Sequence, residues 1–398
     1  HNAMIQISSE TQLFIREHSS DNVRALALQA KKYPDIDMPT AITQIAGRKV
    51  AAEKIPSWWE IEKIWYPKHL SLEQCSSEIT ARYKARLLQG DSLTDLTGGF
   101  GIDCSFLATG FKSATYVERQ EELCEIAAHN FPVLNLNHIN IKNEDGVTYL
   151  QAMSPVDCLF LDPARRNEHG GKTVAISDCE PNVAELEELL LQKANRVMIK
   201  LSPMLDLSLA LKELKQTQEV HILSVNNECK ELLILLGQTS PAEISIHCVN
   251  LFTKGTQKEQ HFVFTREQEQ CSECTYTDSL ETYLYEPNAS LLKAGAFRST
   301  ATAYPVKKLH PNSHLYTSDH FLPDFPGRKF RITSSCGFGK KEVKEMLAAE
   351  KKANLTVRNF PATVAELRKW AHTPGSGIDT SGIGSHKVYV KRKESVIP

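Results

Sequence analysis

The sequence predicts an α/β protein built around a doubly wound parallel sheet. From about residue 91, short apolar runs alternate with amphipathic segments, and one run, VDCLFLD at 156–162, is apolar on both faces. Alternating strand and helix units favour a parallel sheet, and a strand without polar alternation is typical of a sheet covered by helices on both sides. The prediction adds an N-terminal helical region and small α+β domains at the C-terminal end.

Residues 4–89 are predicted to be helical. Polar and apolar residues recur at helical spacing in DNVRALALQAKKY and AITQIAGRKVAAEKI, and prolines divide the region into short helices. An aromatic cluster, formed by Trp58, Trp59, Trp65 and Tyr66, is predicted to pack this region against the next domain. Base stacking by the same rings is the alternative.

Seven apolar runs with β-branched residues are the predicted strands of a domain spanning 90–240. The runs lie at 92–97, 113–118, 138–142, 156–162, 196–201, 219–225 and 230–237. Predicted helices lie between them at 119–131, 181–194 and 207–216. Strands separated by amphipathic helices are the pattern of a parallel sheet.

After Pro241 the alternation stops, and two further domains are predicted, at 241–326 and 327–398. In the first, EISIHCVNLF and QHFVFTR predict a hairpin across the turn KGTQK. In the second, the order strand, basic helix, strand, helix, strand predicts a small α+β domain. Residues 327–398 hold 15 Lys and Arg against 6 Asp and Glu, a balance of +9 in a chain of net charge −2. This asymmetry favours an acidic partner for the last domain, although basic residues can also simply solubilise it.

The ten cysteines are scattered and several lie inside apolar runs, so we expect reduced, mostly structural thiols. Cys271 and Cys274 form one CxxC pair without a second pair at zinc-site spacing, and no metal site is predicted. No apolar run approaches the roughly 20 residues needed to span a bilayer. The expected location is cytoplasmic.

A glycine-rich segment, DSLTDLTGGFGIDCSFLA at 91–108, carries the strongest local signal. A predicted strand ends at Asp95, a turn follows at 98–101, and a helix begins at about Ile102. Glycines allow a tight turn and the close approach of a ligand, which in such folds binds at the carboxyl edge of the sheet. By itself the segment would suit NAD, FAD or another nucleotide.

Acidic residues also follow the next three strands. Glu118 ends its strand 23 residues after Asp95, an offset that suits the two hydroxyls of a ribose. The third strand leads into Asp145 and Gly146, and the fourth ends at Asp162. Helix capping explains one such Asp but is a weak explanation for four acidic residues at one sheet edge.

These motifs resemble those of class I S-adenosylmethionine-dependent methyltransferases, which have a Rossmann-like sheet. DLTGGFG resembles their first motif, YVER their second strand end, and NEDG their adenine-contacting segment. FLDPARR resembles their fourth motif, where RNA and DNA methyltransferases acting on nitrogen carry Asp-Pro-Pro-aromatic. The resemblance covers about 75–240. The remainder is similar to a bacterial group with a ferredoxin-like piece and a THUMP-like domain, and THUMP domains of related enzymes bind RNA, commonly tRNA.

The resemblance implies a role for each matching residue. S-adenosyl-L-methionine would be bound by Asp95, Thr97, Gly99, Phe100, Gly101, Glu118, Arg119, Asp145 and Gly146. Asp95, Gly99 and Gly101 would hold its methionine part, Glu118 with Arg119 its ribose, and Asp145 with Gly146 its adenine. The implied catalytic residues are Asp162, Pro163 and Arg165, with Asp162 facing the methyl-accepting group. Segment 73–88 is predicted to cover the cofactor through Ser77 and Glu78.

One departure from the family pattern concerns Arg165, which stands where an aromatic residue would stack on a flipped base. Ala164 likewise replaces the second proline. An Arg plane can stack on a base or bind a phosphate, and the alternative is that Arg165 and Arg166 only pair with acidic neighbours. The following loop, 168–180, contains two glycines and is a predicted lid.

The leading interpretation is methyl transfer to a nucleobase nitrogen of RNA, either tRNA or rRNA, with the basic C-terminal domain binding the RNA. A small-molecule methyltransferase is one alternative. A non-catalytic RNA- or nucleotide-binding protein is the other.

Overall fold

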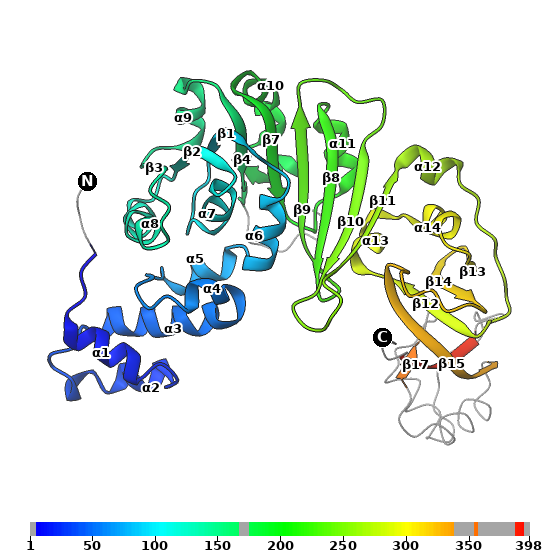
Figure 1. Ribbon diagram of the computed structural model, residues 1–398, viewed down its shortest axis with the longest axis horizontal. Coiled ribbons are helices and arrows are strands. Elements are labelled where there is room, and N and C mark those ends of the chain that lie inside the picture. Colours follow the sequence, from blue (N-terminus) through cyan, green and yellow to red (C-terminus); the bar gives the residue numbers. More distant parts are fainter. Residues whose placement is uncertain (1–4, 167–174, 338–353, 357–386, 394–398) are drawn as a thin grey trace. The chain divides into compact units, whose positions relative to one another are not determined.

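A computed structural model describes residues 5–166, 175–337, 354–356 and 387–393. The chain forms two compact units, 1–220 with 231–242 and 221–230 with 243–398. The boundary between them passes inside strand β8 (Thr217–Val225) and strand β9 (Glu228–Gly237). Figure 1 shows the elements of both units.

The first unit begins with short helices, as predicted. They are α1 (Ser9–Glu17), α2 (Val23–Leu28), η1 (Ala30–Lys32), α3 (Met38–Lys54), α4 (Pro56–Trp59), α5 (His69–Gln74) and α6 (Glu78–Ala85). Ser8, Asn22, Asp37 and Ser77 each accept a hydrogen bond from a first-turn backbone N–H, which explains where four of these helices begin.

The predicted packing of the aromatic cluster is confirmed for Trp58 and Tyr66. Trp58 is 2% exposed and its ring lies edge-on to Phe100, with the centroids 5.1 Å apart. Tyr66 is also buried, and its ring centroid lies 5.9 Å from that of Phe100. Phe100 belongs to the glycine-rich turn, so the helical region packs directly on that turn. Trp65 also packs against this core, whereas Trp59 is 41% exposed and does not belong to it.

The described residues form a nine-stranded sheet, of which six neighbouring strands belong mainly to the first unit, in the order β9-β7-β4-β1-β2-β3. The strands other than β9 are β1 (Gly90–Asp95), β2 (Phe111–Val117), β3 (Ile139–Lys142), β4 (Val156–Leu161) and β7 (Ala194–Leu201). These five pair in parallel, as predicted. The accompanying helices are α7 (Ile102–Ala108), α8 (Glu121–Val133), α9 (Gly146–Ala152), α10 (Val183–Lys193) and α11 (Leu207–Glu213), which flank the sheet in Figure 1.

The prediction of a wholly parallel sheet is wrong at β9, which runs antiparallel to β7. The two residues that connect β8 to β9, Asn226 and Asn227, have positive φ values of 49° and 64°. Positive φ at both central residues is the geometry of a two-residue hairpin turn, which asparagine tolerates. The last two apolar runs of the domain therefore form a hairpin with no helix between them, and β9 lies between β7 and β8.

The second unit contains the predicted hairpin, formed by β10 (Ser245–Leu251) and β11 (Glu259–Thr265). It also contains a six-stranded sheet with the order β13-β14-β12-β15-β17-β16. These strands are β12 (Tyr283–Pro287), β13 (Lys307–His310), β14 (Ser313–Ser318), β15 (Gly327–Gly337), β16 (Asn354–Thr356) and β17 (Lys387–Lys393), with helices α12 (Arg266–Cys271), α13 (Ala289–Ala294) and α14 (Phe297–Ala303). Because β15 pairs with both β12 and β17, one sheet spans the two sides of residue 327. The predicted helices of the last domain lie outside the described residues.

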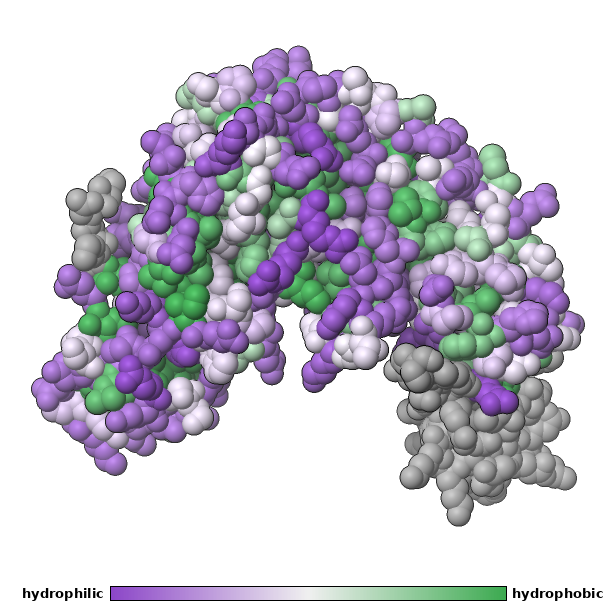
Figure 2. All heavy atoms as spheres, viewed as in Figure 1, coloured by the Kyte–Doolittle hydropathy of each residue, from purple (hydrophilic) through white to green (hydrophobic). Residues whose placement is uncertain are grey.

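Most residues on the face seen in Figure 2 are hydrophilic, and hydrophobic residues appear between them in small groups. The exposed large hydrophobic side chains include Leu28 and Val263, which lie far apart in the sequence. Within the described residues, no helix combines the length and apolar character that a bilayer span requires. The nine cysteines whose side chains are described are all free thiols, Cys271 and Cys274 included.

Candidate functional site

A pocket of about 440 Å³ lies at the carboxyl ends of β1, β2 and β4. Its volume is within the usual range for small-molecule sites. The structure brings all nine residues predicted to bind the cofactor to its lining: Asp95, Thr97, Gly99, Phe100, Gly101, Glu118, Arg119, Asp145 and Gly146. Asp162 and Arg165 also line it, whereas Pro163 is buried and is not among the lining residues.

The glycine-rich turn between β1 and α7 owes its path to positive φ angles. Gly99 has φ +58° and Gly101 has φ +91°, a region that glycine adopts without strain. A Cβ on Gly98 would come within 2.3 Å of the Tyr116 ring, so only glycine lets the turn lie against β2. The turn therefore presents backbone rather than side chains to the pocket at these positions.

Glu118 is held at the end of β2 by two backbone donors. Its two carboxylate oxygens accept hydrogen bonds from the N–H of Gly99 at 2.9 Å and of Gln120 at 2.8 Å. The side chain of Asn143 donates to its carbonyl oxygen, which fixes the strand end as well. Because each carboxylate oxygen can accept a second hydrogen bond, Glu118 keeps capacity for a ligand hydroxyl.

Asp95 is almost fully buried and accepts a hydrogen bond from the N–H of Thr97 at 2.9 Å. Burial raises the pKa of this carboxyl group well above its ordinary value. Asp145 instead caps helix α9 and accepts from the N–H of Thr148 at 3.0 Å. Helix capping therefore explains Asp145, but it does not explain Asp95, since the residue at the N-cap of α7 is Gly101.

At Gly146 the backbone passes so close to the end of β1 that no side chain fits. A Cβ at this position would lie 2.4 Å from the carbonyl oxygen of Leu96. Replacing this glycine would displace the β1 end from the start of α9. Asp145, which caps α9, and Gly146, which lets α9 begin close to β1, thus shape the pocket wall.

Asp162 lies at the end of β4, where Lys200 of β7 approaches it. Their charged groups are 3.3 Å apart, and the Asp162 side chain is 37% exposed. Burial raises the pKa of Asp162, and the charge of Lys200 acts in the opposite direction. Burial disfavours the charged form of Lys200, yet the neighbouring carboxylates, led by Asp162 and Glu231, raise its pKa.

A fully buried ammonium group, Lys84 of α6, lies behind the pocket. Its Nζ is 2.7 Å from a carboxylate oxygen of Asp103, 2.7 Å from one of Glu231, and 2.7 Å from the hydroxyl of Ser76. Burial would raise the pKa of Asp103, but the charges of Lys84 and Lys200 lower it. Lys84 thereby joins the helical region, α7 and β9.

A second link makes these pairs one network. The other carboxylate oxygen of Glu231 lies 4.0 Å from Nζ of Lys200, which pairs with Asp162. The alternating charges run from Asp103 through Lys84, Glu231 and Lys200 to Asp162. Both end members line the pocket, so the network connects two parts of its wall.

Sequence reasoning missed this network, although Lys200 and Glu231 carried a signal. Lys200 and Glu231 stand inside the apolar runs RVMIKL and KELLILLG, and charged residues are rarely buried unless they are paired. Ser77 and Glu78, which were predicted to cover the cofactor, are not among the pocket-lining residues. Ser77 caps α6, and Glu78 accepts hydrogen bonds from Ser57. The residues of this segment that line the pocket are Gln74, Cys75 and Ser76.

Arg165 lies in a short strand, β5 (Ala164–Arg165), that pairs with β6 (Cys179–Glu180). Arg165, Arg166 and Glu180 all line the pocket. The predicted lid falls mainly at 167–174, which lies outside the described residues. The cis peptide bond between Glu180 and Pro181 lies at the pocket wall as well.

Comparison with known structures identifies the family. A crystal structure from Porphyromonas gingivalis W83, of a protein classed as a methyltransferase, is 32% identical and has a TM-score of 0.83. The match covers 98% of this chain and 100% of that chain. The chain belongs to this methyltransferase family. The fold and the resemblance predicted from the motifs are thereby confirmed.

Two family models match the C-terminal part of this methyltransferase, a ferredoxin-like domain at residues 283–326 and a THUMP domain-like family at 327–381. Among more distant structures, a Streptococcus mutans protein classed as a methyltransferase, in complex with SAH, is 15% identical with a TM-score of 0.31. That match covers 41% of this chain and 97% of that chain. No curated protein matches the sequence.

Replacing Lys84 with Met tests the importance of the buried network. The variant leaves Asp103 and Glu231 without their ammonium partner, and breaking a buried pair in this way costs about 3–5 kcal/mol of unfolding free energy. The loss should be largest near neutral pH and shrink on acidification, because the unpaired carboxylates then become protonated. In the wild type, the stabilisation from the lowered pKa of Asp103 is present above the ordinary Asp range and is lost as pH falls below it.

Urea unfolding at several pH values measures this effect. The matched control is Lys112→Met, which removes a lysine from an ion pair with Asp91 whose side chains are 83% and 74% exposed. It should cost less than about 1 kcal/mol. Equal stability of the Lys84 variant and the wild type would show that the network does not support the fold.

Proposed function

We propose that this protein transfers a methyl group from S-adenosyl-L-methionine to a nucleobase nitrogen of RNA, either tRNA or rRNA. One observation carries the proposal: the glycine-rich turn and four acidic strand ends, predicted separately from the sequence, line one pocket. Membership of the methyltransferase family supports the reaction class. The THUMP domain-like match and the basic balance of the last domain support RNA as the substrate.

The pocket fits the chemistry of the proposed cofactor. S-adenosyl-L-methionine carries an ammonium group, a sulfonium centre and two ribose hydroxyls, and carboxylates are suitable partners for all of them. Glu118 is preorganised at the strand end that suits the ribose. The glycine turn leaves room for a ligand, since a Cβ on Gly99 would meet only the Thr97 carbonyl oxygen, at 3.7 Å.

When bound, the cofactor supplies an activated methyl group, so the protein contributes mainly positioning. Asp162 would accept a hydrogen bond from the N–H of the acceptor base, orienting its lone pair and stabilising developing positive charge. Lys200 keeps Asp162 in place and favours its charged, accepting form. Arg165 would stack on the base or bind a flanking phosphate.

Cofactor binding is the first test. Calorimetry should show binding of S-adenosyl-L-methionine, and Glu118→Ala should weaken it by about 10- to 150-fold, the equivalent of about 1.5–3 kcal/mol for a charged hydrogen bond. The control is Glu121→Ala, an exposed carboxylate at the start of α8 that is not among the pocket-lining residues. Tight NAD binding without S-adenosyl binding would contradict the proposal.

The role of Asp162 is tested by Asp162→Asn. Turnover should fall at least about 100-fold, as when one transition-state hydrogen bond is lost, while cofactor affinity stays nearly unchanged. Asp91→Asn, at the exposed start of β1, is the control and should retain turnover. Full turnover in the Asp162 variant would remove this residue from the mechanism.

The pH profile gives a second readout of the same pair. Because Asp162 acts as an acceptor in its charged form and burial raises its pKa, turnover should rise with pH through a value above the ordinary Asp range. Lys200→Met removes the charge that lowers this pKa, so the acidic limb should move to higher pH. If the acidic limb of the turnover profile lies at the same pH in the variant and the wild type, Lys200 does not act on Asp162.

RNA binding is tested by neutralising the basic domain in the full chain, because truncation at residue 326 would remove β15 from its sheet. The variant replaces five lysines, which lie outside the described residues, with Gln: Lys340, Lys341, Lys344, Lys351 and Lys352. Affinity for bulk tRNA and rRNA fragments should fall, and the slope of log affinity against log salt should become shallower by up to about 0.9 per lost phosphate contact.

The matched control neutralises five exposed lysines of the first unit, Lys31, Lys32, Lys63, Lys68 and Lys112. This variant has the same net charge and should bind RNA like the wild type. Equal RNA binding by both variants, or no binding by the wild type at low salt, would favour a small-molecule substrate.

A further inference from the structure

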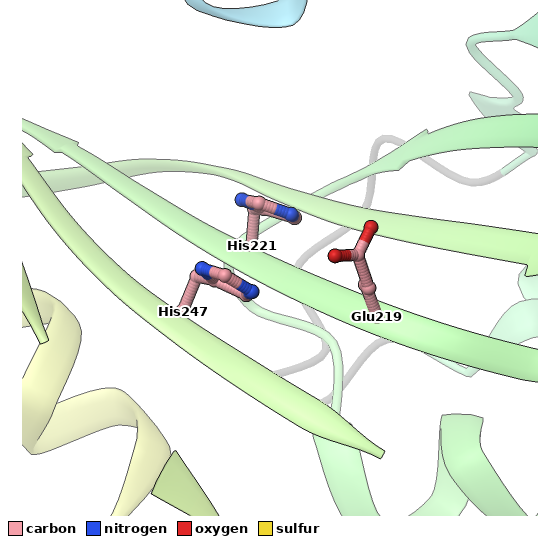
Figure 3. A group of neighbouring side chains, drawn as sticks. All are labelled: Glu219, His221 and His247. Carbon is pink, nitrogen blue, oxygen red and sulfur yellow. The ribbon is translucent and has the colours of Figure 1, made fainter. Parts of the chain in front are cut away.

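Three potential metal ligands lie on neighbouring strands, and none of them is among the pocket-lining residues. Glu219 and His221 are two residues apart on β8, so their side chains lie on the same face of the strand. His247 lies on β10, which is next to β8 in the sheet. Figure 3 shows the three side chains rising from the same side of these strands.

The ligand atoms of these residues are close enough for one ion. One carboxylate oxygen and one nitrogen from each ring lie within 4.8 Å of one another. The two imidazole rings are stacked, with centroids 4.1 Å apart and planes 10° from parallel. Small rotations of the side chains would bring the atoms to the spacing of ligands that bind a metal at about 2.0–2.2 Å.

The chemistry of the set selects the class of ion. Two imidazole nitrogens and one carboxylate favour a divalent transition-metal ion over Mg²⁺ or Ca²⁺, which prefer oxygen ligands. Zn²⁺ readily accepts three such ligands and takes a water as the fourth. His221 is only 2% exposed, so this ligand is already withdrawn from bulk water.

A second layer of residues orients His247. Its Nδ1 is hydrogen-bonded to Nε2 of His261 at 2.8 Å, and its Nε2 lies 3.4 Å from the hydroxyl of Ser245, which an ion would have to replace. Nδ1 of His261 lies 3.7 Å from a carboxylate oxygen of Glu259. Metal-binding histidines are commonly held by such a partner on their other ring nitrogen.

Glu219 has a competing partner. Its carboxylate lies 3.3 Å from the guanidinium group of Arg196, with side chains 34% and 40% exposed. An ion would have to share this carboxylate with Arg196. We therefore expect the two histidines to contribute more to affinity than Glu219 does.

We propose that Glu219, His221 and His247 bind a divalent transition-metal ion, with Zn²⁺ as the best match. The bound ion would link β8 to β10. The two histidines both belong to the second unit, and their strands are hydrogen-bonded neighbours. Binding would therefore stabilise the folded second unit, because the unfolded chain does not hold the ligands together.

The test uses the untagged full chain, stripped with a chelator and titrated with Co²⁺ followed by Zn²⁺. We expect one equivalent of Co²⁺ to give visible absorption bands that Zn²⁺ removes, and Zn²⁺ to raise the unfolding temperature. His261→Ala should weaken binding roughly 10- to 100-fold, as for other orienting partners. His221→Ala and His247→Ala should each lose at least as much, and Glu219→Gln less.

The control is His310→Ala, an exposed histidine of the second unit outside the cluster, which should bind like the wild type. If His221→Ala fails to fold, the half-buried His247 carries the test. The proposal is overturned if no stoichiometric binding occurs or if both variants bind like the wild type. A near-ultraviolet thiolate band with unchanged affinity in the histidine variants would assign the ion to cysteines and would equally overturn it.

Discussion

The ammonium group of Lys84 has no access to solvent, and its charge is acceptable there only because Asp103 and Glu231 lie against it. These contacts tie helix α6, the helix after the glycine-rich turn and the antiparallel strand β9 into one arrangement. Since Asp103 lines the pocket, the same contacts determine the shape of the pocket wall. The position of β9, brought about by its hairpin with β8, is therefore a requirement of the site.

Packing and charge act together at the glycine-rich turn. Trp58 and Tyr66 cover Phe100 from the helical region, while the amide of Gly99 fixes Glu118 from the other side. The turn thus links the N-terminal helices to the carboxylate that we assign to the ribose. The chain belongs to a methyltransferase family, and a methyltransferase depends more on the exact positions of methyl donor and acceptor than on reactive side chains. A rigid turn at the pocket suits this requirement.

Local sequence patterns were sufficient for the strands of the parallel sheet and for the residues around the pocket, since apolar runs and glycine turns are local features. The hairpin at Asn226 and Asn227 was missed, although only the four residues 226–229 separate the two apolar runs and a parallel pair needs a crossover of about a dozen residues or more. The pairing of Lys84 with Glu231 joins residues 147 positions apart, and no local pattern encodes it. Pro163 matched a motif, yet its side chain is buried, so it helps to set the course of the backbone after β4.

The central claim is that the sheet-edge pocket supports methylation of RNA bases. It is tested most directly by incubating the protein with total bacterial RNA and S-adenosyl-L-methionine that carries an isotopically labelled methyl group. The RNA is then digested to nucleosides for mass spectrometry. The account predicts one labelled nucleoside bearing the methyl group on a base nitrogen, absent when the Asp162→Asn variant is used. Unlabelled RNA, together with methyl transfer to a small molecule when a cell extract replaces the RNA, would contradict it.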